Sequence, residues 1–526
     1  MGLKRTAMAA ALAATAFASA GFTPAGAAAE EPRQGGTITV ALNADIRSSD
    51  PGIDRDANTD TVMHHITETL VAYRNDLSIG PALSESWTIS NDGRTYTFTL
   101  REGATFHNGE PVTSAEVKWS WERRFDPALA WPCVPYFDGS AGLEVVAVET
   151  PDPRTVVFRL AEPNALFLAQ LANIQCNIAV IHPDSLNSDG SWDRPVGTGP
   201  FMLKEWRKGQ FVLLERFDDY VPLDEPKSGY AGARIAYADQ VRFLIVPDTS
   251  VAEAALYAGE IDLLPGLSAQ RMAEAEKNGA TIKTVSGLAW TAILVQTEDP
   301  LLSDVRLRRA IAHALDIGQI AAVRTNSLVE ANPSAVPQNS AFFGESFLAW
   351  PEYDPAKAQA LLAEAGYTGE PIRIQTNTRY EGMYQNAIIM QAMLASVGIN
   401  AQLEVLDWAT QLDNYLTGKF QIQSFGYSAR LDPSLLYGIL IGDKSEDPSV
   451  QWEDPEALDL LAQSTQTTDT AERERIFEAL HARMAEQIPI YGLYYEPVID
   501  ATGPKLKSYE AWPGDKARLW GVWKAE

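Results

Sequence analysis

Residues 81–124 hold the pattern that most constrains what this chain can fold into. In segment 95–100, Tyr, Phe and Leu alternate strictly with threonines. An alternation with a period of two predicts a strand with one buried face. Segment 87–90 is a second short strand, and the Asn-Asp-Gly at 91–93 tolerates the positive φ of a tight turn. The sequence therefore predicts a β-hairpin here.

A helix is predicted after this hairpin. Thr113 and Glu116 have the spacing of a capping box, in which two side chains satisfy the free N–H groups of a helix start. Val117, Trp121 and Phe125 then recur every four residues and share one helix face. Taken as local structure, the hairpin and helix are a scaffold and hold no catalytic residues.

Composition limits the class of protein. A chain of 526 residues is longer than one ordinary hydrophobic core supports, so we expect two or three domains. Its 46% hydrophobic and 21% charged residues are typical of a globular protein. A formal net charge of −27, without a basic stripe, argues against nucleic acid as a partner and against adsorption to an anionic membrane.

The N-terminus has the order of a signal peptide. Lys4 and Arg5 precede an apolar, alanine-rich run over 8–22, and small residues follow at 27–29. The apolar run is too short to be a good membrane-spanning helix. Near Ala29 the sequence has no cysteine, so nothing suggests lipid attachment there. We expect residues 1–29 to be removed and the mature protein to be exported to the periplasm.

The chain has two cysteines, Cys133 and Cys176. In an oxidising compartment two cysteines can form one disulfide bond. The alternative is a pair of buried thiols. Either way the expected consequence is for stability, because neither the spacing nor the neighbours suggest a metal site.

One other group raises the question of a metal. His64 and Glu68 lie one turn apart in a predicted helix over 61–73. Two ligands fall short of a metal site, so we interpret them as polar residues on a helix surface. The sequence predicts no metal and no cofactor.

The exact order of residues in the hairpin segment is more informative about the protein family than its secondary structure. Residues 83–117 read L-x-E-S-W-x-I-S-x-D-G-x-T-Y-T-F-x-L-R-x-G-x-x-F-H-N-G-x-P-x-T-x-x-x-V. This resembles the signature of the peptide/nickel family of solute-binding proteins that serve ABC importers. The turn GTGPF at 197–201, ALYAGEID at 255–262 and DVRLRRAI at 304–311 resemble further motifs of that family.

The resemblance implies an α/β fold of the type II periplasmic-binding-protein class, with two lobes, a hinge and an extra domain (a three-domain, cluster-C-like arrangement). We expect the aromatic residues of the last segment to dock onto the first lobe rather than stack on a ligand; they are Tyr491, Tyr494, Tyr495, Trp512, Trp520 and Trp523. The implied order is the signal peptide at 1–29, lobe I at 30–70, an inserted domain II at 71–195, lobe I again at 196–285, lobe II (domain III) at 286–489, and lobe I at 490–526.

The resemblance also implies a ligand cleft. In peptide-binding members, an acid in a stretch that begins Gly-Trp and ends Asp-Pro pairs with the free amino group of the ligand. Here that position falls on Arg430, whose planar fork suits a carboxylate or phosphate. The alternatives are that Arg430 turns outward or pairs with Asp432. The nearest counterpart of the family's carboxylate-binding arginine is Arg379. The expected ligand-binding residues are Arg430, Tyr427, Asp432, Arg379, Tyr380, Trp408, Tyr437, Asn43 and Asp45.

The function implied is that of a monomeric receptor. It would close around a peptide or peptide-like solute and deliver it to the permease of an ABC importer at the inner membrane. A metal chelate, an opine-like anion or an oligosaccharide are alternative cargoes. A secreted hydrolase is the rival class, but the chain has no Gly-x-Ser-x-Gly elbow and no His-Glu-x-x-His helix, so no catalytic residue is assigned.

Overall fold

A mixed sheet of ten strands is the frame of the computed structural model, which describes residues 31–525. The strand order is β14-β13-β15-β12-β16-β11-β1-β10-β9-β8. The strands, in chain order, are β1 (Thr37–Leu42), β8 (Phe201–Arg207), β9 (Phe211–Arg216), β10 (Gln240–Ile245), β11 (Leu263–Leu264), β12 (Thr281–Val295), β13 (Ile372–Asn377), β14 (Ala401–Leu406), β15 (Ile422–Tyr427) and β16 (Ile490–Thr502). We call the half with β1 and β8–β11 lobe I, and the half with β13–β15 lobe II.

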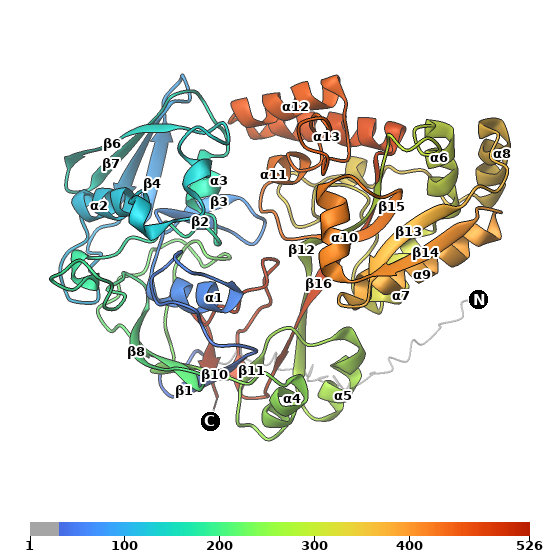
Figure 1. Cartoon of the computed structure of the whole chain (residues 1–526). Helices are drawn as coiled ribbons and strands as arrows, with labels where there is room; N and C mark the ends of the chain where they lie inside the picture. Colours follow the sequence, from blue (N-terminus) through green and yellow to red (C-terminus); the bar gives the residue numbers. More distant parts are fainter. Residues whose placement is uncertain (1–30, 526) are drawn as a thin grey trace, which may run out of the picture. The chain divides into compact units, whose positions relative to one another are not determined.

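The long strands β12 and β16 lie side by side and join the two halves of the sheet (Figure 1). They pair antiparallel, and the register shifts between Ser286 and Trp290 and again between Thr291 and Ala292. Pro497, opposite Ser286, has no N–H to donate to the ladder. A Cβ on Gly287 would lie 2.4 Å from the carbonyl oxygen of Glu496, so only glycine fits this close approach. This break marks the connection between the lobes.

Lobe I places three helices around its part of the sheet. Val40 of β1, Phe243 of β10 and Leu263 of β11 are fully buried, because the central strands of a parallel sheet are covered on both faces. The helices are α1 (Ala57–Ile66), α4 (Thr249–Tyr257) and α5 (Met272–Lys277). Two short strands near the C-terminus, β17 (Leu506–Lys507) and β18 (Trp523–Lys524), pair with each other.

A separate four-stranded sheet, ordered β4-β5-β7-β6, contains the predicted hairpin. The hairpin is confirmed, because β4 and β5 pair antiparallel and Tyr96, Phe98 and Leu100 are buried in alternation with half-buried threonines. The capping box of Thr113 and Glu116 is present as predicted. This region consists of β2 (Val71–Tyr73), β3 (Ile79–Pro81), β4 (Ser84–Ile89), β5 (Thr95–Leu100), α2 (Ser114–Arg124), β6 (Val145–Asp152), β7 (Thr155–Leu160) and α3 (Phe167–Leu171).

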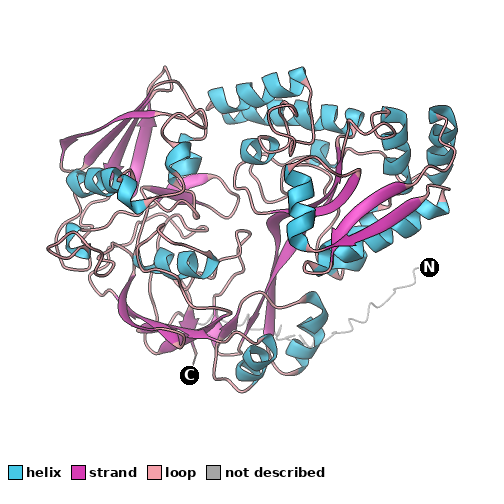
Figure 2. Cartoon of the chain, viewed as in Figure 1, coloured by secondary structure: helices cyan, strands magenta, loops and turns pink. Residues whose placement is uncertain are grey.

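Lobe II covers both faces of its sheet, as Figure 2 shows for the helices around β13–β15. Successive side chains of a strand point to opposite faces. Accordingly, Ile293 of β12 joins one hydrophobic core and the adjacent Leu294 joins the other. The helices of this lobe are α6 (Val305–Ala314), α7 (Ile317–Thr325), α8 (Pro355–Ala365), α9 (Glu381–Ser396), α10 (Trp408–Leu416), α11 (Pro433–Tyr437), α12 (Pro455–Gln466) and α13 (Thr470–Gln487).

The helix predicted over 61–73 is wrong in its bounds and its exposure. The chain is helical in α1 but enters strand β2 at Val71. His64 and Glu68 are buried rather than exposed. Nε2 of His64 lies 3.1 Å from the carbonyl oxygen of Ile174, and the Glu68 carboxylate accepts bonds of 2.7 and 2.9 Å from Arg101. These polar side chains find their partners in distant segments, which local periodicity cannot reveal.

The expectation for the C-terminal aromatic residues is partly wrong. Tyr491 and Tyr494 of β16 lie in a core of lobe II, because β16 continues past the break into that lobe. Trp512 and Trp520 pack against Tyr230, with ring centroids 4.8 and 5.3 Å apart. The domain boundaries drawn from the sequence stay predictions.

The predicted signal peptide at 1–29 lies outside the described residues. Within residues 31–525, every helix is too short or too polar to cross a membrane. The disulfide between Cys133 and Cys176 is formed, with the two Cα atoms 5.8 Å apart. Both cysteines belong to the core of the four-stranded-sheet region.

Candidate functional site

A cavity of about 490 Å³ lies where lobe II meets the strands that join the lobes. Strands β13, β14 and β15 are parallel, so their carboxyl ends meet at one edge of the sheet. Arg379 and Tyr380 follow β13, Trp408 follows β14, and Tyr427 ends β15. All four line this cavity, which we call the hinge pocket. The sheet topology thus brings together four of the nine residues predicted from the sequence.

Aromatic rings form a continuous wall in the hinge pocket. The rings of Tyr380 and Trp408 are 4.9 Å apart in an edge-to-face arrangement, and Trp408 lies 5.9 Å from Phe425. Tyr427 is stacked at 6.1 Å on Trp290, which comes from β12. Such a wall offers apolar and π contacts to a ligand.

Two charged side chains line the same pocket. Arg379 is exposed, and its guanidinium lies 5.7 Å from the ring centroid of Tyr380. Glu496, on β16, accepts a 3.1 Å hydrogen bond from the hydroxyl of Thr291 on β12. Burial raises the pKa of Glu496, while Thr291, Arg324 and Tyr494 act to lower it. The pocket therefore contains both a basic and an acidic group.

Arg430 lies in the loop that follows β15, outside the residues that line the hinge pocket. It is half-buried, and its Nη1 donates to the carbonyl oxygens of Ser428 and Ala429 at 3.2 and 3.1 Å. The alternative that Arg430 pairs with Asp432 is wrong for this structure. Asp432 is buried and accepts instead from Arg473, at 2.7 and 3.0 Å.

Two further predicted residues have internal roles here. Tyr437 is fully buried in a core of lobe II and is stacked on Phe477, with ring centroids 6.2 Å apart. Asp45 accepts from the indole N–H of Trp206 at 3.0 Å and from the backbone of Gly209 at 2.7 Å. Asp45 therefore holds the turn between β8 and β9.

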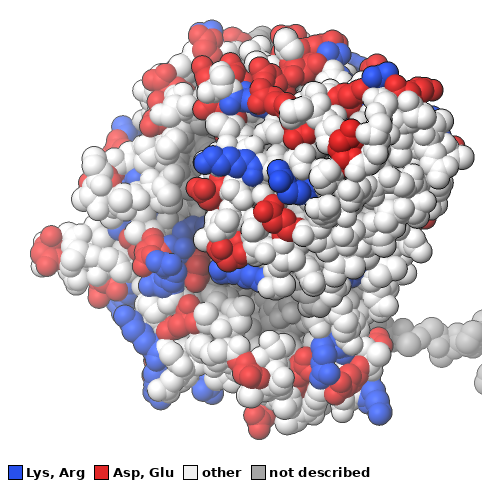
Figure 3. Space-filling view, turned by 45° about the vertical axis from the view of Figure 1, so that its right-hand side comes forward, with Lys and Arg blue, Asp and Glu red and all other residues white. Residues whose placement is uncertain are grey.

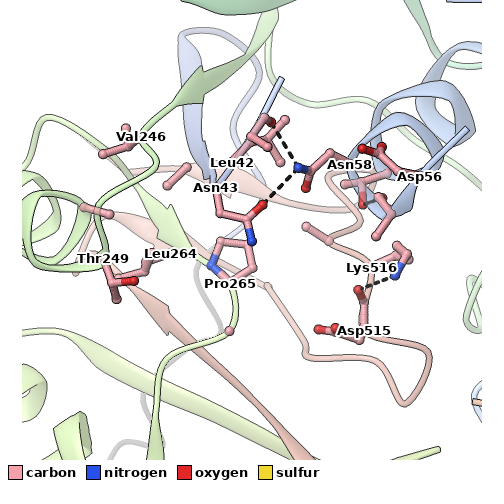
Figure 4. Close-up of a pocket in the computed structure, with 17 residues that line it drawn as sticks. Leu42, Asn43, Asp56, Asn58, Val246, Thr249, Leu264, Pro265, Asp515 and Lys516 are labelled. Atoms are coloured by element: carbon pink, nitrogen blue, oxygen red, sulfur yellow. Dashed lines mark hydrogen bonds between the residues drawn. The ribbon is translucent and has the colours of Figure 1, made fainter. Parts of the chain in front are cut away.

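Asn43 lines a second cavity, of about 430 Å³, on lobe I (Figure 4). Its Oδ1 accepts a 2.9 Å bond from Asn58, which also donates to the carbonyl of Ala44 at 3.0 Å. Lys516 lines the same cavity, and its Nζ donates to the carbonyl of Asp515 at 3.0 Å. Figure 3 shows that one face of the molecule is hollowed and carries both acidic and basic side chains along the hollow.

Some lining residues escaped the sequence analysis. Thr291 lies on β12 and Glu496 on β16, and Lys516 belongs to a C-terminal loop far along the chain. No local motif marks these positions, because long-range contacts bring them to a pocket: for Thr291 and Glu496 these are the pairing of β12 with β16. Within residues 31–525, no group of three or more His, Cys, Asp or Glu side chains is placed to hold a metal ion.

Comparison with known proteins decides the family. Residues 78–446 match the model of the bacterial extracellular solute-binding proteins, family 5 (middle). This chain belongs to that family. Family 5 proteins are the solute-binding receptors of ABC importers, and the type II fold predicted from the sequence is confirmed.

Three relatives of this family 5 protein are informative. The glutathione-binding protein GsiB of Escherichia coli K12 is 27% identical over 496 residues, which are 90% of this chain and 92% of GsiB. The structure of DppA from Helicobacter pylori with the peptide STSA has a TM-score of 0.70 at 27% identity, covering 94% of this chain and 99% of DppA. AgaA from A. tumefaciens R10 with agropinic acid has a TM-score of 0.68 at 27% identity, covering 93% and 99%.

Proposed function

We propose that this family 5 protein binds a small peptide-like solute that carries a carboxylate, and delivers it to the permease of an ABC importer. The hinge pocket is the observation that carries the proposal. It combines an aromatic wall with Arg379 at the junction between the lobes. Closure of two lobes about a hinge would enclose a solute bound there. GsiB, which is named for binding glutathione, and DppA, whose structure contains a peptide, support this cargo class.

Arg430 supports the anionic character of the solute. Its guanidinium has backbone carbonyls as partners and leaves further N–H donors for a carboxylate. We propose that Arg430 and Arg379 face the solute from two successive loops when the lobes close. The cavity with Asn43 and Lys516 on lobe I would supply the opposite wall.

An opine-like anion is the second candidate cargo. The relative AgaA was solved with agropinic acid, and the same two arginines would suit the acid groups of such a compound. The protein would act as a receptor outside the cytoplasm in either case, in line with the role of its family.

The test is titration calorimetry on the mature chain, exported to a bacterial periplasm and purified without refolding. Glutathione, the peptide Ser-Thr-Ser-Ala and agropinic acid are the ligands, and each is recovered afterwards for mass spectrometry. We expect one of the first two to bind and to return chemically unchanged. Binding of agropinic acid alone would favour the second candidate, and conversion of a ligand would contradict the receptor role.

A further inference from the structure

We propose that the carboxylate of Glu496 binds a primary ammonium group of the solute at the base of the hinge pocket. This inference rests on the proposed function and deepens it, because it names a free amine as part of the cargo. Glu496 lines the pocket beside Thr291 and the aromatic residue Trp290. The three come from the two strands that join the lobes, so the ammonium would bind at the hinge itself.

The strand geometry fixes where Glu496 points. Tyr495 belongs to one core of lobe II, and Tyr494 and Glu496 flank it in the strand. Because strand side chains alternate, Glu496 lies on the same face as Tyr494, whose hydroxyl bonds with Asn386 of α9. The carboxylate is therefore directed toward the start of α9, which borders the pocket.

The carboxylate has few partners of its own. The Thr291 hydroxyl donates to one oxygen and the Tyr494 side chain is a second hydrogen-bonding partner, but within residues 31–525 no Lys or Arg nitrogen forms an ion pair with Glu496. The side chain is half-buried, and its raised pKa reflects solvent removed without full compensation. An ammonium group brings three N–H donors and a positive charge in direct contact with the carboxylate, which Thr291, Tyr494 and the more distant Arg324 do not supply.

A glycine keeps access to Glu496 open. The position that a Cβ on Gly382 would take lies 3.4 Å both from Oε1 of Glu496 and from Nη2 of Arg324. Gly382 lines the pocket, so its missing side chain leaves the carboxylate exposed to a ligand there. Arg324 stands on the other side of this gap and has its own partner, because its Nη1 donates to Gln385. It is a neighbouring cation that moderates the negative charge of Glu496.

The pocket also suggests the orientation of the cargo. The amine would lie at β16, next to the rings of Trp290 and Tyr427, and the acid groups would lie toward Arg379 after β13. Aromatic faces attract a neighbouring cation, so the aromatic wall and the carboxylate of Glu496 both favour binding of the ammonium group. A solute with an ammonium and a carboxylate at separate ends fits this arrangement.

The decisive experiment combines a variant with a modified ligand. Glutathione and Ser-Thr-Ser-Ala are each titrated in two forms, with a free and with an acetylated amino group, into wild type, Glu496→Gln and the control Glu446→Gln. Glu446 is an exposed acid of lobe II outside the pocket. We expect Glu496→Gln to lose about tenfold or more in affinity for the free amine and little for the acetylated form. Glu446→Gln should match the wild type.

The outcomes separate the two proposals. Equal affinity of the wild type for free and acetylated peptides would overturn the role of Glu496 but leave the peptide receptor standing. Failure of the wild type to bind either peptide would overturn the proposed function and this inference with it. Thr291→Ser and Thr291→Val provide a second measurement, because Ser keeps the hydroxyl that holds the carboxylate and Val removes it. Only Thr291→Val should weaken binding of the free amine.

Discussion

Both terminal nitrogens of Arg473 donate to the carboxylate of Asp432, at 2.7 and 3.0 Å, and both side chains are buried. Asp432 also accepts from the backbone of Ser434 and so begins helix α11. This pair anchors the end of the loop that carries Arg430. Because the Asp432 carboxylate is already occupied, Arg430 has no acid partner within its own loop.

The first prediction concerns this anchor. Arg473→Ala leaves Asp432 buried without its counter-ion, and we expect it to lower the free energy of unfolding by about 3–5 kcal/mol. Arg475→Ala is the matched control, since Arg475 pairs with Glu472 on the same helix but is exposed. Exposed pairs contribute little to stability, because water screens them. Urea unfolding of both variants gives the comparison, and equal losses would contradict the anchoring role.

Arg430 gives the second prediction. If it faces the solute, Arg430→Ala should weaken an anionic ligand by about tenfold to a hundredfold, because a charge-assisted bond is removed. Arg430→Lys should recover part of the affinity, as it keeps the charge but loses the planar fork. Calorimetry with the tightest ligand of the panel measures both. An affinity unchanged in Arg430→Ala would show that this side chain turns away from the cleft.

The break between β12 and β16 gives the third prediction. A methyl group on Gly287 would collide with the backbone carbonyl of Glu496, so Gly287→Ala must displace one of the joining strands. We expect a loss of about 1–3 kcal/mol in unfolding free energy and weaker ligand binding. Gly344→Ala is the control, because the nearest atom to its Cβ would be 3.8 Å away. The two variants should differ clearly in thermal unfolding.

The disulfide between Cys133 and Cys176 gives the fourth prediction. It joins residues 43 apart. Closing a loop of that length lowers the conformational entropy of the unfolded chain and so raises its free energy by about 4 kcal/mol. Replacing both cysteines by serine should lower stability by up to that amount. Ligand affinity should stay the same, since neither cysteine lines the hinge pocket. A change in affinity with unchanged stability would contradict a purely structural role.

Buried histidines give the fifth prediction, on pH. Burial lowers the pKa of His64 and His65 to about 3, and that of His107 and His481 to about 4. In the unfolded chain they titrate near 6.5. As the pH falls below about 6.5, the unfolded state therefore binds protons that the folded state does not, and the free energy of unfolding decreases until the pH reaches the folded pKa values. At pH 5.5 each costs about 1.4 kcal/mol relative to pH 7.5.

Buried carboxyl groups with a raised pKa, among them Asp60 and Asp500, oppose this trend. Burial raises the pKa of Asp60 and Asp500 to about 6, so these groups favour the folded state more as the pH falls through that value. Denaturant unfolding at pH 7.5 and 5.5 measures the sum, and the four histidines should dominate. Replacing His481 by Gln should make the loss on acidification smaller. A wild type more stable at pH 5.5 would contradict the prediction.

Local sequence patterns determined much of the scaffold. The alternation in 95–100, the turn at 91–93 and the capping box at Thr113 are all present, because hydrogen bonding within a few residues and one buried face suffice to specify them. The family signature over the same segment then led to the two-lobed fold. It also led to the loops after β13, β14 and β15, where Arg379, Trp408 and Tyr427 meet.

Only the tertiary structure decided the partners of the charged residues. The sequence leaves open whether Asp432 would bind Arg430 or face a ligand, and its actual partner, Arg473, is 41 residues away. Glu496 reaches the pocket because β16 pairs with β12 across roughly two hundred residues of chain, a separation over which composition and periodicity carry no information. Local sequence patterns specify which segments form strands, turns and helices. Long-range pairing then decides which of their side chains meet.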